Sequence, residues 1–250
     1  KPFKKKSVLS SVFGTSKNDE KNFQENYYEK KDEFKKNGFV SDFFNRADYI
    51  IFGLPKNYIE GILDIVNNED IYTYDVKVSY AKKDNYKVEL INTVNNHEQI
   101  ILRNKDGVYV ITPRINKSFK FQSDWPYNNS QVYLLNPILE DINSDEERNF
   151  EEISDGYKIT VNANYPNNPK LVKQEILFDK NANIKKVTVI DKDGNAQITM
   201  NFNKVDLKSK FNDNYFDLKQ IIDVKEDNNI DNENDEVFLI YTREEVAEDL

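Results

Sequence analysis

The chain has 250 residues and a formal net charge of −9, from 35 Lys and Arg against 44 Asp and Glu. This acidic balance argues against a general nucleic-acid surface, so we expect no nucleic-acid partner. The absence of cysteine and the single histidine exclude disulfides, thiolate metal sites, a cysteine nucleophile and chemistry that needs two imidazoles. We therefore expect no metal and no cofactor.

The composition changes twice along the chain, which predicts three parts. Residues 1–40 begin with a lysine-rich stretch and are predicted to form a flexible basic arm. Residues 41–218 carry regular apolar patterns and are predicted to form the folded domain. Residues 219–250 are predicted to form an acidic tether with a β-prone run, Val237–Tyr241. We expect this run to pair as a strand within its own chain, in a strand-exchanged homodimer, or with a partner.

The folded part begins with two stretches of helical periodicity. Apolar residues repeat on one helical face within 41–53, where Ser41 suits the N-cap and Gly53 the stop. Pro55 then suits the first turn of a second helix. The apolar face of this second helix consists of Tyr58, Ile59, Ile62, Leu63 and Val66. We predict two short helices that cover the apolar face of a sheet.

From Tyr72 the apolar period changes to two residues, which is typical of antiparallel strands with one solvated face. The predicted strands cover residues 72–80, 86–93, 98–104, 108–112, 118–122, 157–163, 171–178, 184–191 and 196–203. A helix is predicted over 134–142, and Pro137 must kink or restart it. Ser144 and Glu147 form a capping-box pattern that predicts one more short helix. The fold class is mainly β with helices (α+β).

The sequence contains no self-sufficient catalytic pattern, so we predict that the protein is not an enzyme. His97 lies between two predicted strands and is interpreted as an exposed turn residue. Residues 227–238 resemble a calcium loop only in part, because Asn232 and Phe238 replace the required Gly and Glu. Asp191, with Asp193 and Asn195, is better explained by a hairpin turn. Paired carboxylates of a glycan hydrolase stay open, because such a pair is defined in space.

Trp125 is the one tryptophan of the chain, between Asp124 and Pro126. Two interpretations stay open: it anchors its loop against the sheet, or it offers an aromatic contact to a partner. Because the cores of interfaces favour aromatic residues, exposed aromatics near the helices are the candidate partner-binding set. These candidates are Phe43, Phe44, Tyr49 and Trp125.

One longer segment, from Phe119 to Leu135, contains Ser123-Asp124-Trp125-Pro126 and Ser130-Gln131-Val132-Tyr133-Leu134-Leu135. With the hairpin at 99–113 and the closing stretches 200–206 and 211–218, this segment resembles the LolA-like superfamily of lipoprotein carriers and lipoproteins. It is most similar to the Gram-positive sporulation and germination branch. The resemblance implies a LolA-like curved antiparallel half-barrel with helices packed on its concave face.

The resemblance to the germination branch also implies a function. That function is a non-catalytic spore germination lipoprotein, extracytoplasmic and lipid-anchored at a spore membrane that faces the cortex. Its implied partner is a zinc-dependent N-acetylmuramoyl-L-alanine amidase, which it supports in the muramic-δ-lactam modification of cortex peptidoglycan. This chain has no cysteine to carry a lipid. The anchor therefore lies outside this sequence, or the implied anchoring fails.

The alternative function is a carrier that holds lipid or lipoprotein acyl chains in the half-barrel. The two functions differ in the state of the cavity, since a carrier needs an open apolar space of several hundred cubic ångströms. The residues that we expect to plug that cavity in a binding protein are Tyr58, Ile62, Leu63, Leu135 and Leu139.

Overall fold

The computed structural model describes residues 56–67, 70–81, 85–126 and 130–226 of the chain. Several predictions concern residues outside these ranges. They are the basic arm, the helix at 41–53 with Phe43, Phe44 and Tyr49, and the run Val237–Tyr241.

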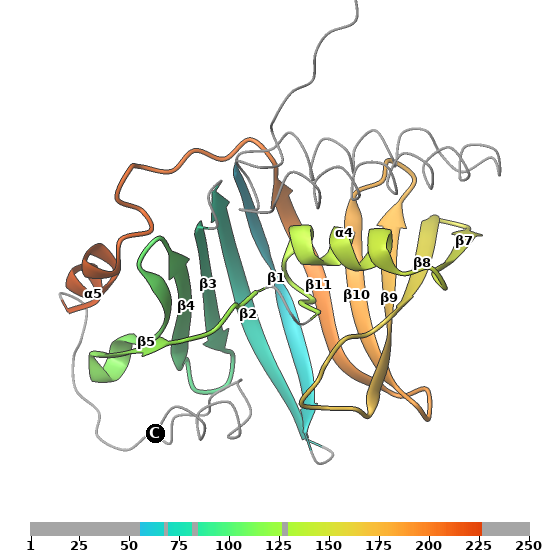
Figure 1. Ribbon diagram of the computed structural model, residues 1–250, viewed down its shortest axis with the longest axis horizontal. Coiled ribbons are helices and arrows are strands. Elements are labelled where there is room, and N and C mark those ends of the chain that lie inside the picture. Colours follow the sequence, from blue (N-terminus) through green and yellow to red (C-terminus); the bar gives the residue numbers. More distant parts are fainter. Residues whose placement is uncertain (1–55, 68–69, 82–84, 127–129, 227–250) are drawn as a thin grey trace, which may run out of the picture.

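One open antiparallel sheet of eleven strands dominates the described residues (Figure 1). Its strands are β1 (Lys56–Asn67), β2 (Asp70–Ala81), β3 (Asn85–Asn92), β4 (Glu98–Asn104), β5 (Gly107–Thr112), β6 (Lys117–Phe121), β7 (Asn149–Ile153), β8 (Gly156–Asn162), β9 (Leu171–Asp179), β10 (Ile184–Asp191) and β11 (Ala196–Asp206). Their order in the sheet is β6-β5-β4-β3-β2-β1-β11-β10-β9-β8-β7. Two meanders, β1–β6 and β7–β11, are therefore joined where β1 pairs with β11.

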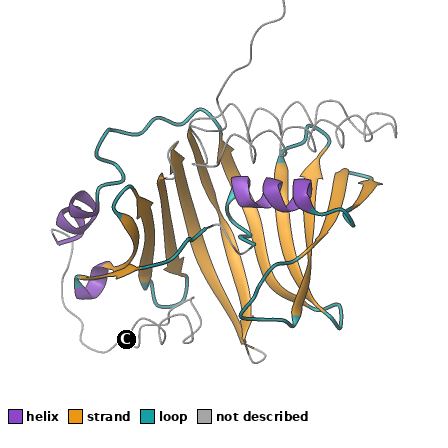
Figure 2. Cartoon of the chain, viewed as in Figure 1, coloured by secondary structure: helices purple, strands orange, loops and turns teal. Residues whose placement is uncertain are grey.

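Few helices accompany this sheet. Helix α4 (Leu135–Ser144) lies across the sheet on the side of β8–β11, and α5 (Leu218–Glu226) lies near β4 and β5 at the other end (Figure 2). A short 3₁₀ turn, η2 (Pro113–Ile115), precedes β6. Because α4 begins at Leu135, Pro137 lies in its first turn, where its missing amide hydrogen leaves no helical bond unmade.

The predicted helix over 55–66 is wrong, because this segment is strand β1. Its residues alternate in burial: Ile59 and Leu63 face the core, while Tyr58 and Ile62 are only half-buried on the other face. All twelve residues pair with β2, and β11 binds the other edge, so the backbone is satisfied as a central strand. Helical spacing and strand alternation overlap in so short an apolar segment, and tertiary pairing decides between them.

Two further predictions need correction near the helices. The short helix expected from Ser144 and Glu147 is absent from the described residues: α4 ends at Ser144, and the Asp145 carboxylate accepts the Glu147 amide at 2.8 Å before β7 begins. At the other end, α5 extends to Glu226, into the segment predicted as an acidic tether. It is held there because its first turns pack into an apolar cluster through Ile221 and Ile222.

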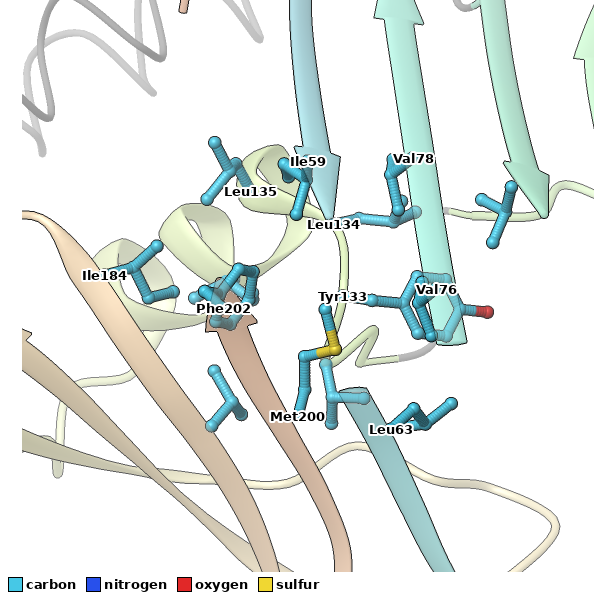
Figure 3. Packing of buried hydrophobic residues seen from close by; sticks show 14 of the residues in the cluster. Ile59, Leu63, Val76, Val78, Tyr133, Leu134, Leu135, Ile184, Met200 and Phe202 are labelled. Atoms are coloured by element: carbon cyan, nitrogen blue, oxygen red, sulfur yellow. The ribbon is translucent and has the colours of Figure 1, made fainter. Parts of the chain in front are cut away.

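Apolar side chains form two clusters on opposite faces of the sheet. The larger cluster, here the main core, combines inward residues of β1–β5 and β8–β11 with the loop before α4 and α4 itself. Figure 3 shows Leu63 and Met200 from the strands beneath Tyr133, Leu134 and Leu135. The smaller cluster, here the satellite core, lies on the other face. It contains Ala81, Ile100, Leu102, Ile111, Phe216 and Ile221.

The resemblance implied that the helices pack on the concave face. In the described residues, the two helices lie on opposite faces of the sheet. Helix α4 belongs to the main core, while α5 belongs to the satellite core. Neither helix is long and apolar enough to cross a membrane, as far as the described residues extend.

Candidate functional site

The described residues of the segment that carries the resemblance form β6, the connecting residues 122–126 and 130–134, and the start of α4. Within it, Trp125 is 6% exposed and packs edge-on against Tyr86 of β3, with ring centroids 5.8 Å apart. The Arg103 guanidinium donates a hydrogen bond to the Trp125 carbonyl oxygen. The indole of Trp125 is hydrogen-bonded to the phenol of Tyr133, whose pKa is raised by burial. These contacts attach the loop to β3 and β4.

Trp125 is therefore an anchor of its loop, and its proposed role as an exposed partner contact needs correction. Little of its surface is left for a partner, because Trp125 is 6% exposed and packs against Tyr86 in the main core. A large aromatic beside a proline in a loop gains more from burial than from exposure to water. The other candidates, Phe43, Phe44 and Tyr49, lie outside the described residues.

A buried polar cluster lies where the loop, α4 and β9 meet. The Gln174 side-chain amide, from β9, donates to the Asp141 carboxyl of α4 at 2.7 Å. The Ser130 hydroxyl accepts the Asn164 amide at 2.9 Å and is also hydrogen-bonded to Asp141. The Ser130 amide in turn donates to the Asn164 carbonyl at 2.8 Å. This Ser130–Asp141–Gln174 cluster joins three segments that are distant in the sequence.

Burial changes the protonation of this cluster. The pKa of Asp141 is raised to about 6, because desolvation outweighs the hydrogen bonds from Gln174 and Ser130. The nearby Tyr165 phenol also has a raised pKa, first because of burial and then because of Tyr133 and Asp141. Gln174 is fully buried, and its carbonyl oxygen has no hydrogen-bond partner. The cluster is thus a polar contact beside the apolar core in which one buried acceptor, the Gln174 carbonyl oxygen, is left unpaired.

The sequence contained a signal for this cluster. Gln174 occupies an inward position of β9, in alternation with Ile176 and Phe178, where an apolar residue is expected. Asp141 likewise follows Ile138 by three residues, which places it near the apolar stripe of α4. A polar residue in an inward position of each element indicates that the two meet.

The five cavity-plugging candidates divide between the two faces of the sheet. Leu63, Leu135 and Leu139 are buried in the main core. Tyr58 and Ile62 alternate with Leu63 on β1 and lie on the opposite face. There, burial and a hydrogen bond to Glu60 raise the pKa of Tyr58 to about 12, and the Lys204 ammonium lies 5.1 Å from its ring centroid. Three of the five candidates are therefore core residues, on helix α4 and strand β1, and the other two are not.

The sequence-predicted turn residues have structural partners. In the turn before β4, the His97 amide donates to the Asn95 side chain at 3.0 Å, and its ring Nε2 lies 2.7 Å from Arg114 Nη1. The Asp191 carboxylate accepts the amides of Asp193 and Asn195, and the bond from Asn195 leads the effects that lower its pKa. The hairpin interpretation of Asp191 is confirmed. No group of three metal-ligating side chains occurs among the described residues.

The chain is similar to a curated protein and to solved structures. No family model matches the chain. The sporulation protein YdcC of Bacillus subtilis (strain 168) is 35% identical over 159 residues, which is 63% of this chain and 47% of that protein. The chain therefore spans about half the length of this curated relative.

Two solved structures are similar at low identity. One is the CwlD amidase from Clostridioides difficile in complex with the GerS lipoprotein. The match has 19% sequence identity and a TM-score of 0.37, and it covers 68% of this chain and 94% of the matched chain. The other is the LolA superfamily protein NE2245 from Nitrosomonas europaea, with 12% identity, 71% and 97% coverage and a TM-score of 0.38.

Proposed function

We propose that this chain is a non-catalytic sporulation protein that binds and supports a cortex N-acetylmuramoyl-L-alanine amidase. The observation that carries the proposal is the 35% identity to a sporulation protein over 159 residues. The motif segment Phe119–Leu135 supports the same assignment, because it resembles the sporulation and germination branch of the LolA-like superfamily. Within that branch it resembles the clostridial germination lipoprotein GerS.

The structure supports a binding role because the motif residues are buried and structural. Trp125, Ser130 and Leu134 are buried and join the loop to the sheet and to α4. Asp141, the half-buried acid of this region, is engaged by Gln174 at 2.7 Å. These residues therefore stabilise a scaffold, and the surfaces left for a partner are the solvated face and an edge of the sheet.

The finer parts of the proposal concern place and pathway. The partner is a CwlD-type, zinc-dependent amidase, and the zinc belongs to that partner. The protein acts outside the cytoplasm, lipid-anchored at a spore membrane that faces the cortex through a cysteine outside this sequence. There the pair prepares cortex peptidoglycan for muramic-δ-lactam formation.

The packing of the main core favours this proposal over the acyl-chain carrier. A carrier holds its ligand in an open apolar space between helix and sheet. Here Leu135, Ile138 and Leu139 of α4 are buried against strand residues such as Ile59 and Met200. The apolar side chains beneath α4 thus contact protein, so an acyl chain must displace them to enter.

Co-expression with the spore's own CwlD-type amidase, followed by size exclusion, tests the proposal. We expect one complex that elutes ahead of either protein, and higher amidase activity on cortex peptidoglycan than without this chain. An amidase of the same class that acts outside spores is the matched control and is expected to elute separately. Separate elution of the spore amidase with unchanged activity contradicts the proposal. Release of a bound lipid from the purified chain supports the carrier instead.

A further inference from the structure

The two edges of the open sheet differ in charge and exposure. Edge strand β6 carries Lys117 and Lys120, both exposed, and Phe119, which is 53% exposed. Edge strand β7 carries Glu151 and Glu152, both exposed. Among the described strands only β5 pairs with β6, so β6 is the end of the sheet. An exposed edge that presents a large aromatic favours the addition of another strand.

The exposed ring of Phe119 lies on the same side of the sheet as the main core. Phe119 is directly opposite Val110 of β5, and Phe121 is opposite Val108, and both valines belong to the main core. Side chains that face each other across paired strands share one face of the sheet. A strand added outside β6 would therefore cover Phe119 and extend the main core by one strand.

We propose that the run Val237–Tyr241 adds to the outer edge of β6 in its own chain, as a twelfth strand. The β-prone run is five residues long, and β6 has the same length. Its alternation matches the edge: Val237, Leu239 and Tyr241 share one face, as Lys117, Phe119 and Phe121 do in β6. The inference does not depend on the amidase proposal.

The position of α5 makes this edge the one within reach. Helix α5 packs against η2, which immediately precedes β6, and its cluster with Ile111 of β5 lies at the same end of the sheet. Ten residues, 227–236, separate the end of α5 from Val237. An extended segment of that length spans at most about 33 to 36 Å. A five-residue strand is only about 17 Å long, so the tether reaches any part of β6.

Charge distinguishes β6 from β7 as the docking edge. Residues 227–236 contain Asp227, Asp231, Glu233, Asp235 and Glu236 and no Lys or Arg. This acidic tether is attracted to Lys117 and Lys120 beside β6. It is repelled by Glu151 and Glu152 of β7, at the far end of the sheet.

Disulfide trapping in the full chain tests the pairing, and the absence of native cysteine means that each double variant holds only the introduced pair. Phe119→Cys is combined in turn with Val237→Cys, Leu239→Cys and Tyr241→Cys, because facing residues of paired strands lie within disulfide range. We expect an intramolecular disulfide in at least one combination. Phe150→Cys on β7, with the same partners, is the matched control and is expected to remain reduced.

Other outcomes overturn the proposal. A disulfide that links two chains assigns the edge to a second copy, and equal trapping at Phe150→Cys shows contact without specificity. Hydrogen exchange on the unaltered chain is the second measurement. We expect the amides of 237–241 to exchange at least about tenfold more slowly than a free peptide of that sequence. Unprotected amides contradict the pairing even if every cysteine variant misfolds.

A charge reversal tests the electrostatic contribution of Lys117 and Lys120 to the pairing. Lys117→Glu with Lys120→Glu is expected to reduce the protection of 237–241, and added salt is expected to narrow the difference from the unaltered chain. Lys77→Glu with Lys185→Glu, at exposed positions of β2 and β10 within the sheet, is the matched control and should leave protection unchanged. Equal effects of the two pairs contradict the assignment to β6.

Discussion

The two faces of the sheet are covered to very different extents. Among the described residues, the main core extends from β5 to β8 and is covered by α4 and by residues 125 and 132–134 before it, whereas the satellite core occupies only the β2–β5 end of the opposite face. In β2, residues 78–81 are buried on both faces because the two clusters overlap there. The rest of the second face carries charged residues such as Glu60 and Lys204, which form a 3.2 Å ion pair.

This difference indicates that the residues that stabilise the fold are distinct from the surfaces available for binding. The segment that carries the resemblance belongs to the main core, where Trp125, Ser130 and Leu134 are buried. Its sequence pattern therefore reports how the scaffold is closed and does not locate a partner contact. A partner would bind the solvated face or an edge of the sheet, where the polar composition leaves little sequence pattern.

The largest expected effect is a cavity in the main core. Ile138 of α4 is 0% exposed, so Ile138→Ala removes buried methyl groups from a site enclosed on all sides. We expect a loss of about 4 kcal/mol in the free energy of unfolding, measured by urea denaturation. A loss below about 1 kcal/mol would contradict the view that α4 seals this face.

Gly61 tests how tightly β1 and β11 approach in the main core. A Cβ atom at this position would lie 2.2 Å from the Asn201 carbonyl oxygen and 2.5 Å from Met200 Cε, beside the bulge between Glu60 and Gly61. Gly61→Ala forces a backbone shift in β11, and we expect it to cost about 3 kcal/mol. The same urea titration measures the loss. Unchanged stability would mean that the β1–β11 contact relaxes freely.

The satellite core is expected to respond less. Ile221 of α5 is 8% exposed and packs in a cluster of six buried residues at the end of the sheet. Because a small peripheral cluster collapses around a deletion more easily, Ile221→Ala is expected to cost about 2 kcal/mol. Equal losses for Ile221→Ala and Ile138→Ala would remove the distinction between the two cores.

The raised pKa of Asp141 predicts a pH dependence of stability that arises beside the main core. Because burial raises its pKa to about 6 from 3.8, the folded chain binds the proton more tightly than the unfolded chain. The protonated Asp141 carboxyl therefore stabilises the folded state fully below about pH 4. This stabilisation declines as the pH rises from about 4 to 6. Above pH 6 the ionised, partly desolvated carboxylate remains a cost to folding.

Asp141→Asn removes this penalty and provides an amide that can donate to the unpartnered Gln174 carbonyl. We expect a gain of about 2 kcal/mol at pH 7.5, and a smaller change of stability between pH 4 and 6. Asp155→Asn, in the exposed turn before β8, is the control and should leave both quantities unchanged. A variant that is less stable than the original chain at every pH contradicts the account.

Features that depend on residues close together in the sequence were predicted better than features that depend on distant residues. All nine predicted strands are present, because most of them alternate apolar and polar residues over their own length and β4 is a short apolar run. The strands β1 and β7 were not predicted. Tyr58, Ile62 and Leu63 fit both a helix and a strand, and β7 alternates weakly at the sheet edge, with only Phe150 and Ile153 partly buried. Gly61 was a usable signal, since a glycine inside a strand marks a close backbone approach.

The candidate site was predicted less completely than the fold. Leu135 and Leu139 were placed correctly in the apolar face of α4, from helical spacing alone. The Ser130–Asp141–Gln174 cluster was missed, since its members are separated by up to 44 positions and meet only when α4 lies on β9. The burial of Trp125 also depended on Tyr86, which is distant in the sequence.

The sequence by itself determined the period of each strand, the hairpin turns, the apolar stripe of α4 and the exclusion of thiol and two-histidine chemistry. These are properties of residue types at short spacing, where sterics and local hydrogen bonds act. The tertiary structure alone decided that β1 is a strand, that α4 and α5 lie on opposite faces, and that Asp141 is held in a buried contact. Each of these depends on burial against distant segments, because the free energy of burying apolar surface outweighs local preference.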